Sequence, residues 1–164
     1  MFKNAFGVLQ KVGRALMLPV ALLPAAGLLL GFGNAFQSER MLELLPFLSA
    51  DWIQLTSRVM EDAGGIIFAN LALLFAIGVA IGLVGDGAAG LAAIVGYLVL
   101  NQVMRSWIGV TPAMIEADPG YASVLGIPTL HRGVFGGIIV GLVAELFFHR
   151  FQYFDMPSFL VFFV

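Results

Sequence analysis

The sequence has no cysteine and few charged residues. Only 11% of its 164 residues are Asp, Glu, Lys or Arg, whereas a typical soluble domain has about 25%. The absence of cysteine excludes disulfides, thiolate nucleophiles and cysteine-based metal sites, and two histidines alone do not form a metal centre. The few basic residues form no patch with interleaved aromatics, so nucleic acid is not an expected partner.

Apolar residues dominate what is present. Hydrophobic residues make up 60% of the chain, and the mean hydropathy is +1.00. A membrane-spanning helix needs about 20 consecutive apolar residues, and the apolar runs have about this length. The composition therefore predicts an all-α membrane protein, a bundle of about four transmembrane helices plus amphipathic interfacial helices, in contact with membrane lipid. The predicted spans lie near residues 15–33, 63–85, 87–104 and 133–148.

The first apolar run, residues 15–33, is preceded by Lys3, Lys11 and Arg14. Basic residues beside a span favour the cytoplasmic side, so we expect a multi-pass protein with a cytoplasmic N-terminus. The run is longer than the 7–15 apolar residues of a signal peptide, which indicates a retained helix. Residues 1–14 have one apolar and one basic face, typical of an interfacial helix. They could equally be the charged front of the first span.

Small residues recur at four-residue spacing in three predicted spans, a pattern that lets helices pack closely. The pairs are Gly27 and Gly31, Gly78 and Gly82, and Gly137 and Gly141.

The composition of the segments between the spans predicts loops. The charges in residues 34–62 indicate an outside loop with a surface-lying helix that begins at Asp51, and the prolines in residues 105–132 indicate a second outside loop. Asp86 lies between two glycines and predicts a tight turn, so the second and third spans should form a helical hairpin.

Five stretches, in order along the chain, resemble the glucose and N-acetylglucosamine permeases of the bacterial phosphotransferase system, the enzyme IIC domains. They are LQKVGRALMLPVALLPAAGLLLGFG (9–33), AGGIIFANLALLFAIGVAIGL (63–83), GDGAAGLAAIVGYLVLN (85–101), LGIPTL (125–130) and GVFGGIIVGLV (133–143). The LGIPTL stretch is most similar to the glucose-type members.

This resemblance implies a multi-pass protein of the bacterial inner membrane that imports a sugar, with glucose expected, while the sugar is phosphorylated. The phosphoryl group would pass from phosphoenolpyruvate through IIA and IIB phosphocarrier domains to the sugar. A homodimer is expected, with no cofactor. Residues 1–164 resemble only the front half, the scaffold of an enzyme IIC domain, and residues 151–164 read as the start of a truncated segment.

The catalytic cysteine of IIB and the rear-half sugar motifs are absent from this sequence. The chain alone is therefore not expected to phosphorylate a sugar, although it would belong to a phosphotransferase system. The alternative is a non-transporting membrane scaffold or dimerisation module.

Five polar residues are candidate site residues. Asn70 and Glu145 are substrate-binding candidates because polar groups at membrane depth are often functional. Asn70 could instead form an interhelical hydrogen bond, and Glu145 could pair with His149, four residues on, or with Arg150. Asp86, His149 and Arg150 could contact a cytosolic partner. No residue is assigned a catalytic or metal-binding role.

Two further basic residues, which precede the first span, can be interpreted in two ways. Lys11 and Arg14 could contact a phosphate-bearing substrate or lipid headgroups, or could only set the topology. His131, beside Arg132, is expected to be solvated.

Overall fold

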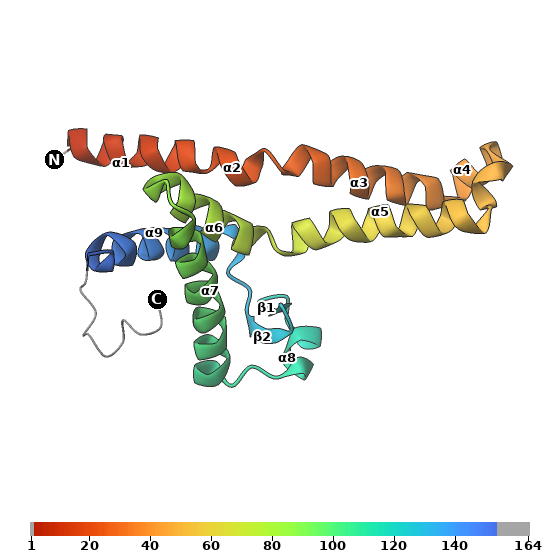
Figure 1. Cartoon of the computed structure of the whole chain (residues 1–164). Helices are drawn as coiled ribbons and strands as arrows, with labels where there is room; N and C mark the ends of the chain where they lie inside the picture. Colours follow the sequence, from red (N-terminus) through yellow and green to blue (C-terminus); the bar gives the residue numbers. More distant parts are fainter. Residues whose placement is uncertain (1, 154–164) are drawn as a thin grey trace, which may run out of the picture.

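A computed structural model describes residues 2–153. Almost all regular structure is helical, with one small β-hairpin (Figure 1). The elements are α1 (Phe2–Ala15), α2 (Met17–Val20), α3 (Leu23–Gln37), α4 (Glu39–Leu44), the 3-10 helix η1 (Pro46–Ser49), α5 (Asp51–Ala69), α6 (Leu71–Val84), α7 (Gly87–Ile108), α8 (Pro112–Ala117), β1 (Tyr121–Val124), β2 (Ile127–Leu130) and α9 (Gly133–Phe151). The predicted segment 151–164 lies mostly outside the described residues.

The helices are apolar enough to cross a membrane. Residues 10–37, α7 and α9 each have the length and hydropathy of a span, and the bent pair α5–α6 makes a fourth if it counts as one. Large apolar side chains also cover much of the surface; Trp107 is 86% exposed and Phe135 is 80% exposed. Because soluble monomers rarely expose extended apolar surface, these features confirm an all-α membrane protein.

The first three helices, α1, α2 and α3, follow one another almost in line (Figure 1). Local breaks at Leu16 and at residues 21–22 separate them, close to Pro19 and Pro24, because proline cannot donate a backbone hydrogen bond. The candidate span begins at Gln10, inside α1, and runs to the end of α3.

The loop predicted for residues 34–62 is largely helical. Helix α5 runs unbroken from Asp51 to Ala69 and packs along α3 (Figure 1). A Cβ on Gly64 would lie 2.5 Å from the backbone nitrogen of Leu30, so these helices meet backbone to backbone. The Glu61 carboxylate accepts hydrogen bonds from Asn34 Nδ2 (3.2 Å) and Gln37 Nε2 (2.6 Å). The helix predicted to begin at Asp51 does begin there, and its charged residue Glu61 is hydrogen-bonded within the α3–α5 hairpin.

The run predicted as a span over residues 63–85 is not one straight helix. The chain breaks at Asn70, where α5 and α6 meet at a bend of 60°. The Asn70 Nδ2 donates to the Ile66 carbonyl at 2.8 Å. Such a side chain competes with the helical backbone for its hydrogen bonds, which explains why an uninterrupted apolar run is not one straight helix.

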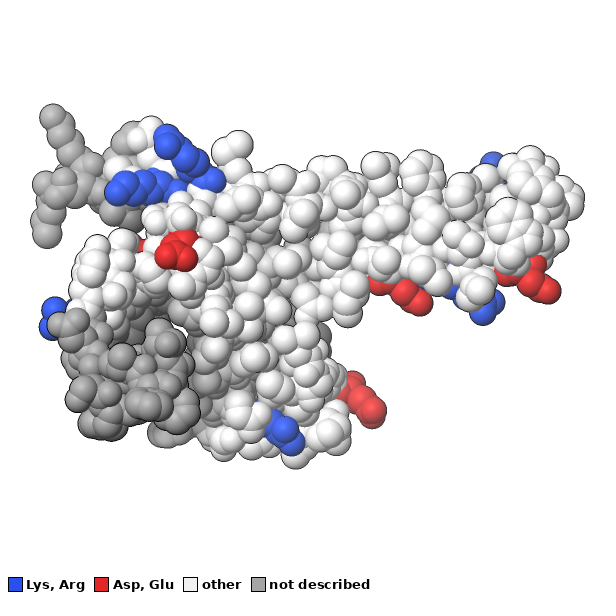
Figure 2. Space-filling view, viewed as in Figure 1, with Lys and Arg blue, Asp and Glu red and all other residues white. Residues whose placement is uncertain are grey.

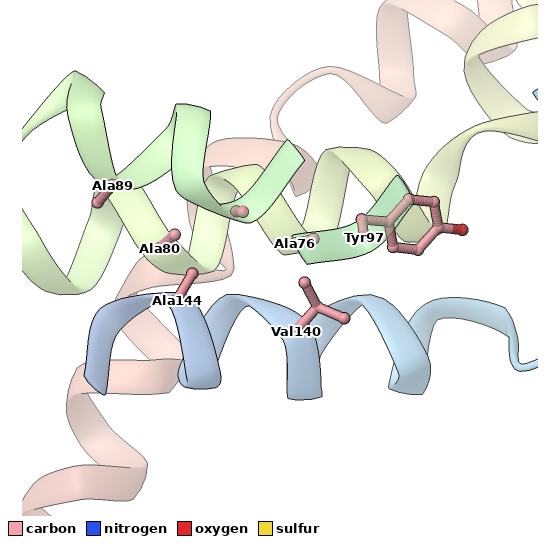
Figure 3. Packing of buried hydrophobic residues seen from close by; sticks show 7 residues of the cluster. Ala76, Ala80, Ala89, Tyr97, Val140 and Ala144 are labelled. Carbon is pink, nitrogen blue, oxygen red and sulfur yellow. The ribbon is translucent and has the colours of Figure 1, made fainter. Parts of the chain in front are cut away.

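Small residues form the core where α6, α7 and α9 meet. The buried cluster is Ala76, Ala80, Ala89, Ala93, Tyr97, Val140 and Ala144 (Figure 3). A Cβ on Gly137 would overlap the Ala72 carbonyl oxygen, and one on Gly141 would lie 2.7 Å from that of Ala76. The predicted packing pair on α9 is therefore confirmed.

The other two predicted glycine pairs do not pack at the α6–α9 contact. Gly78 packs against Pro19 and Gly82 against Ala15, so this pair brings α6 against α1 and α2. Gly27 and Gly31, in contrast, have no neighbour within 4 Å among the described residues. The close approach of α3 to α5 uses Gly33 instead.

The second predicted loop, residues 105–132, contains more structure than expected. Helix α7 continues to Ile108 and ends at Gly109, whose φ of +73° is typical of a helix C-terminus. After α8, strands β1 and β2 pair antiparallel, with Tyr121 opposite Leu130. The two hairpin residues, Leu125 and Gly126, both have positive φ (51° and 80°), as a tight two-residue turn requires.

Candidate functional site

A polar cavity of about 210 Å³ lies beside the helix break. The end of α5, the start of α6, the middle of α7, the β-hairpin and the start of α9 line it. The polar side chains in this lining are Tyr97, Asn101, Ser123, His131 and Arg132. Broken helices in membrane proteins often form binding sites, because the break leaves backbone groups and helix ends free to face a cavity.

Asn101 is the centre of the polar contacts in this wall and is only 2% exposed. Its Nδ2 donates to the Tyr97 carbonyl at 2.8 Å, and its Oδ1 accepts from Arg132 Nη2 at 2.9 Å. Its own carbonyl accepts from the Thr129 hydroxyl at 3.3 Å. These contacts attach the β-hairpin and the start of α9 to the middle of α7.

Arg132 supplies positive charge to the cavity. It immediately precedes α9, and partial burial lowers the pKa of its guanidinium. An arginine nevertheless stays charged in proteins and has five N–H donors, so one bond to Asn101 leaves donors for other partners. Figure 3 shows the Tyr97 hydroxyl pointing away from the alanine cluster. The lining thus offers hydrogen-bond donors to a small ligand with several oxygen acceptors.

No metal centre accompanies this cavity. Within residues 2–153, no group of three His, Cys, Asp or Glu side chains could hold a metal ion.

Asn70 adjoins the cavity, because Ala69 and Leu71 are part of its lining. Its side chain caps α5 through the Ile66 carbonyl. Asn70 thus lies at the break beside the cavity, and within residues 2–153 its side chain bonds its own helix and not another one.

The other predicted site residues lie elsewhere. Glu145 Oε1 and His149 Nε2 are 3.5 Å apart, as their spacing predicts. They lie near the far end of α9 from Arg132, about 20 Å away at 1.5 Å per residue, and Arg150 follows them. Asp86 caps α7 by accepting a hydrogen bond from the Ala88 backbone N–H at 2.9 Å, beside Gly85 with a φ of +80°. The turn reading therefore accounts for the contacts of Asp86.

Sequence reasoning missed the residues that organise the cavity. Asn101 and Thr129 are buried polar residues, and Arg132 reaches Asn101 across 31 positions of sequence. An uncharged polar residue inside a predicted span was a usable signal for Asn101. Nothing local indicated that Arg132 would reach it, because that contact depends on how the hairpin folds back. His131 is exposed, as expected.

Comparisons with known proteins place these features in a family. The family model described as "Phosphotransferase system, EIIC" matches residues 13–164. The PTS system glucose-specific EIICBA component of Staphylococcus carnosus (strain TM300) is 56% identical over 165 residues, covering 99% of this chain and 24% of the relative. The corresponding component of Staphylococcus saprophyticus is 55% identical with the same coverage.

The chain thus spans about a quarter of the length of the curated relatives it matches. The match with the family model includes α2 to α9 and the whole polar cavity. The chain belongs to the phosphotransferase system EIIC family.

Proposed function

We propose that the chain is the front part of the membrane domain of a sugar permease that couples import to phosphorylation, with glucose as its sugar. The observation that carries this proposal is the family match through residues 13–164. The glucose assignment relies on the relatives, which are glucose-specific EIICBA components. The apolar helices, which have the length of membrane spans, support a transport role.

The expected partners are IIB and IIA phosphocarrier domains. The relatives' name, EIICBA, supports this, and this sequence has no cysteine to carry a phosphoryl group itself. The protein would lie in the bacterial inner membrane with a cytoplasmic N-terminus, in line with the basic residues before the first span. We also expect a homodimer.

The chain's own role would be that of a scaffold. Helices α7 and α9 border an apolar groove of about 780 Å³, and its lining includes Leu91, Val95 and Phe147, each more than half exposed. Such a face suits packing against further apolar helices. The same groove is the observation that favours the second candidate function, a non-transporting membrane scaffold or dimerisation module.

Within the permease, the polar cavity is a better candidate for a sugar contact than Glu145 or Asn70. Several of its lining side chains carry hydrogen-bond donors, whereas Glu145 lies 3.5 Å from His149 and Asn70 caps a helix. Donors of this kind suit the oxygens of a sugar.

The test is sugar uptake and phosphorylation in cells that lack their own glucose and N-acetylglucosamine permeases. The cells would express this chain alone, or this chain together with the rear half of an enzyme IIC domain and a IIB domain. Activity only in the second case is the expected result. Activity from the chain alone would contradict the scaffold role, and inactivity in both cases would favour the non-transporting module.

A further inference from the structure

A basic recess lies where α1 crosses α6, far from the polar cavity. Its volume is about 450 Å³, and it is lined by Gly7, Gln10, Lys11, Arg14, Gly82 and Leu83. In Figure 2 basic side chains gather at this end of the molecule, with acidic side-chain atoms just below them and largely uncharged surface around both. The proposed sugar chemistry does not use this recess, and of its lining residues Gly82 takes part in the contact between α6 and α1.

The helix geometry brings the polar side chains of α1 to one side. Positions 7, 10, 11 and 14 fall within about 100° of each other on a helix, because each residue advances by 100°. Ala15, at the edge of this face, is the point of closest approach: a Cβ on Gly82 would lie 2.6 Å from its Cα. Two small residues thus bring the helices into contact, and the long basic side chains border the recess beside that contact.

The charges in this recess are available for a ligand. Gln10, Lys11 and Arg14 are all exposed. Among the residues whose side chains the structure describes, no carboxylate lies within ion-pair distance of Lys11 or Arg14. The last turn of α6 also ends here, and its partial negative charge favours the two cations but opposes an anion, so Lys11 and Arg14 must supply the attraction.

The apolar helix surface beside the recess suits a ligand that is itself a membrane lipid. The recess flanks the apolar stretch that begins at Ala15 and continues through α3, so a molecule bound there would meet basic groups at one end and apolar helix surface at the other. Basic pockets between membrane helices bind anionic lipid headgroups, whose phosphate accepts several hydrogen bonds. A free phosphate would use only the basic part.

We propose that Lys11 and Arg14 bind the phosphate of an anionic phospholipid headgroup at the α1–α6 crossing. Arg14 donates hydrogen bonds to the phosphate oxygens, Lys11 adds a second positive charge, and the acyl chains lie along the apolar surface of the helices. This inference does not depend on the identity of the transported sugar.

The test is lipid binding by the purified protein, measured by native mass spectrometry with added dioleoyl phosphatidylglycerol or dioleoyl phosphatidylcholine. The variant K11Q/R14Q removes both charges. The matched control, R40Q/R58Q, removes two exposed charges from α4 and α5. A third variant, K11R/R14K, keeps both charges in place. Circular dichroism checks that each variant folds.

We expect the wild type to prefer phosphatidylglycerol. Each basic side chain near an anionic surface contributes a factor of about five, so K11Q/R14Q should bind this lipid roughly 30-fold more weakly. R40Q/R58Q and K11R/R14K should bind it like the wild type.

Three results would overturn the proposal. Equal loss in K11Q/R14Q and R40Q/R58Q would mean a general effect of net charge. Binding of inorganic phosphate that disappears in K11Q/R14Q, with unchanged lipid binding, would identify a free anion as the ligand. Unchanged lipid binding with weakened binding of a separately purified IIB domain would assign the basic pair to that protein partner.

Discussion

The contact between α6 and α9 can be tested with a single methyl group. Replacing Gly137 by alanine places a Cβ onto the Ala72 carbonyl oxygen, which is backbone and cannot rotate away. Overpacking of this kind costs about 1–3 kcal/mol, and we expect the upper part of that range. The better helix propensity of alanine returns about 0.5–1 kcal/mol. The expected net loss of stability is therefore about 1–2 kcal/mol.

The measurement is reversible unfolding in mixed micelles of dodecyl maltoside and SDS, followed by far-ultraviolet circular dichroism. Gly31→Ala is the matched control, because nothing lies within 4 Å of the added methyl group there. It should be as stable as the wild type or slightly more stable. If Gly137→Ala unfolds at the same SDS fraction as Gly31→Ala, the reasoning about backbone contact between α6 and α9 is refuted.

The contacts of Asp86 and Arg132 can be tested in the same unfolding assay. Asp86→Ala removes the cap on the Ala88 N–H and should cost about 1 kcal/mol, whereas Asp86→Asn should retain most of the stability; equal losses in the two variants would contradict the cap. Arg132→Ala leaves the buried Oδ1 of Asn101 without its donor, at a cost of about 1–3 kcal/mol. It should also speed amide hydrogen exchange in residues 121–130, and unchanged exchange there would mean that Arg132 does not hold the hairpin.

Apolar length and small-residue spacing anticipated much of the fold. The predicted spans 87–104 and 133–148 correspond to α7 and α9, which extend three or four residues further at their C-terminal ends. The extension of α7 was missed because Arg105 was assigned to the second loop, although a basic side chain is favourable in the last turn of a helix.

Two features escaped prediction because tertiary contacts decide them. The charges of α5 indicated an outside loop with a surface-lying helix, whereas the structure hydrogen-bonds Glu61 to side-chain amides of α3 that are 24 and 27 residues away in sequence. The break at Asn70 interrupts a run that contains no proline, and hydropathy alone cannot detect it. From the sequence, Asn70 is predicted as a substrate-binding residue or as an interhelical hydrogen bond, and neither prediction includes a helix break.

The polar cavity shows the same limit. Tyr97 and Asn101 lie four residues apart on α7, and this spacing is visible in the sequence. The hairpin that carries Thr129 to Asn101 depends on a turn at Leu125, where positive φ is uncommon for a residue other than glycine. The sequence pattern therefore reveals the residues on α7 but not those that the hairpin brings to them.

The most direct test of the proposed function is an exchange of this chain into a complete relative. In the glucose-specific EIICBA component of Staphylococcus carnosus, the matching segment would be replaced by residues 1–164 of this protein. Phosphoenolpyruvate-dependent phosphorylation of labelled glucose would then be measured in membranes. The proposed function predicts activity clearly above that of membranes without any EIICBA component, and reduced activity when the exchanged chain carries Gly137→Leu. A chimera that is inserted and folded but phosphorylates no glucose would contradict it.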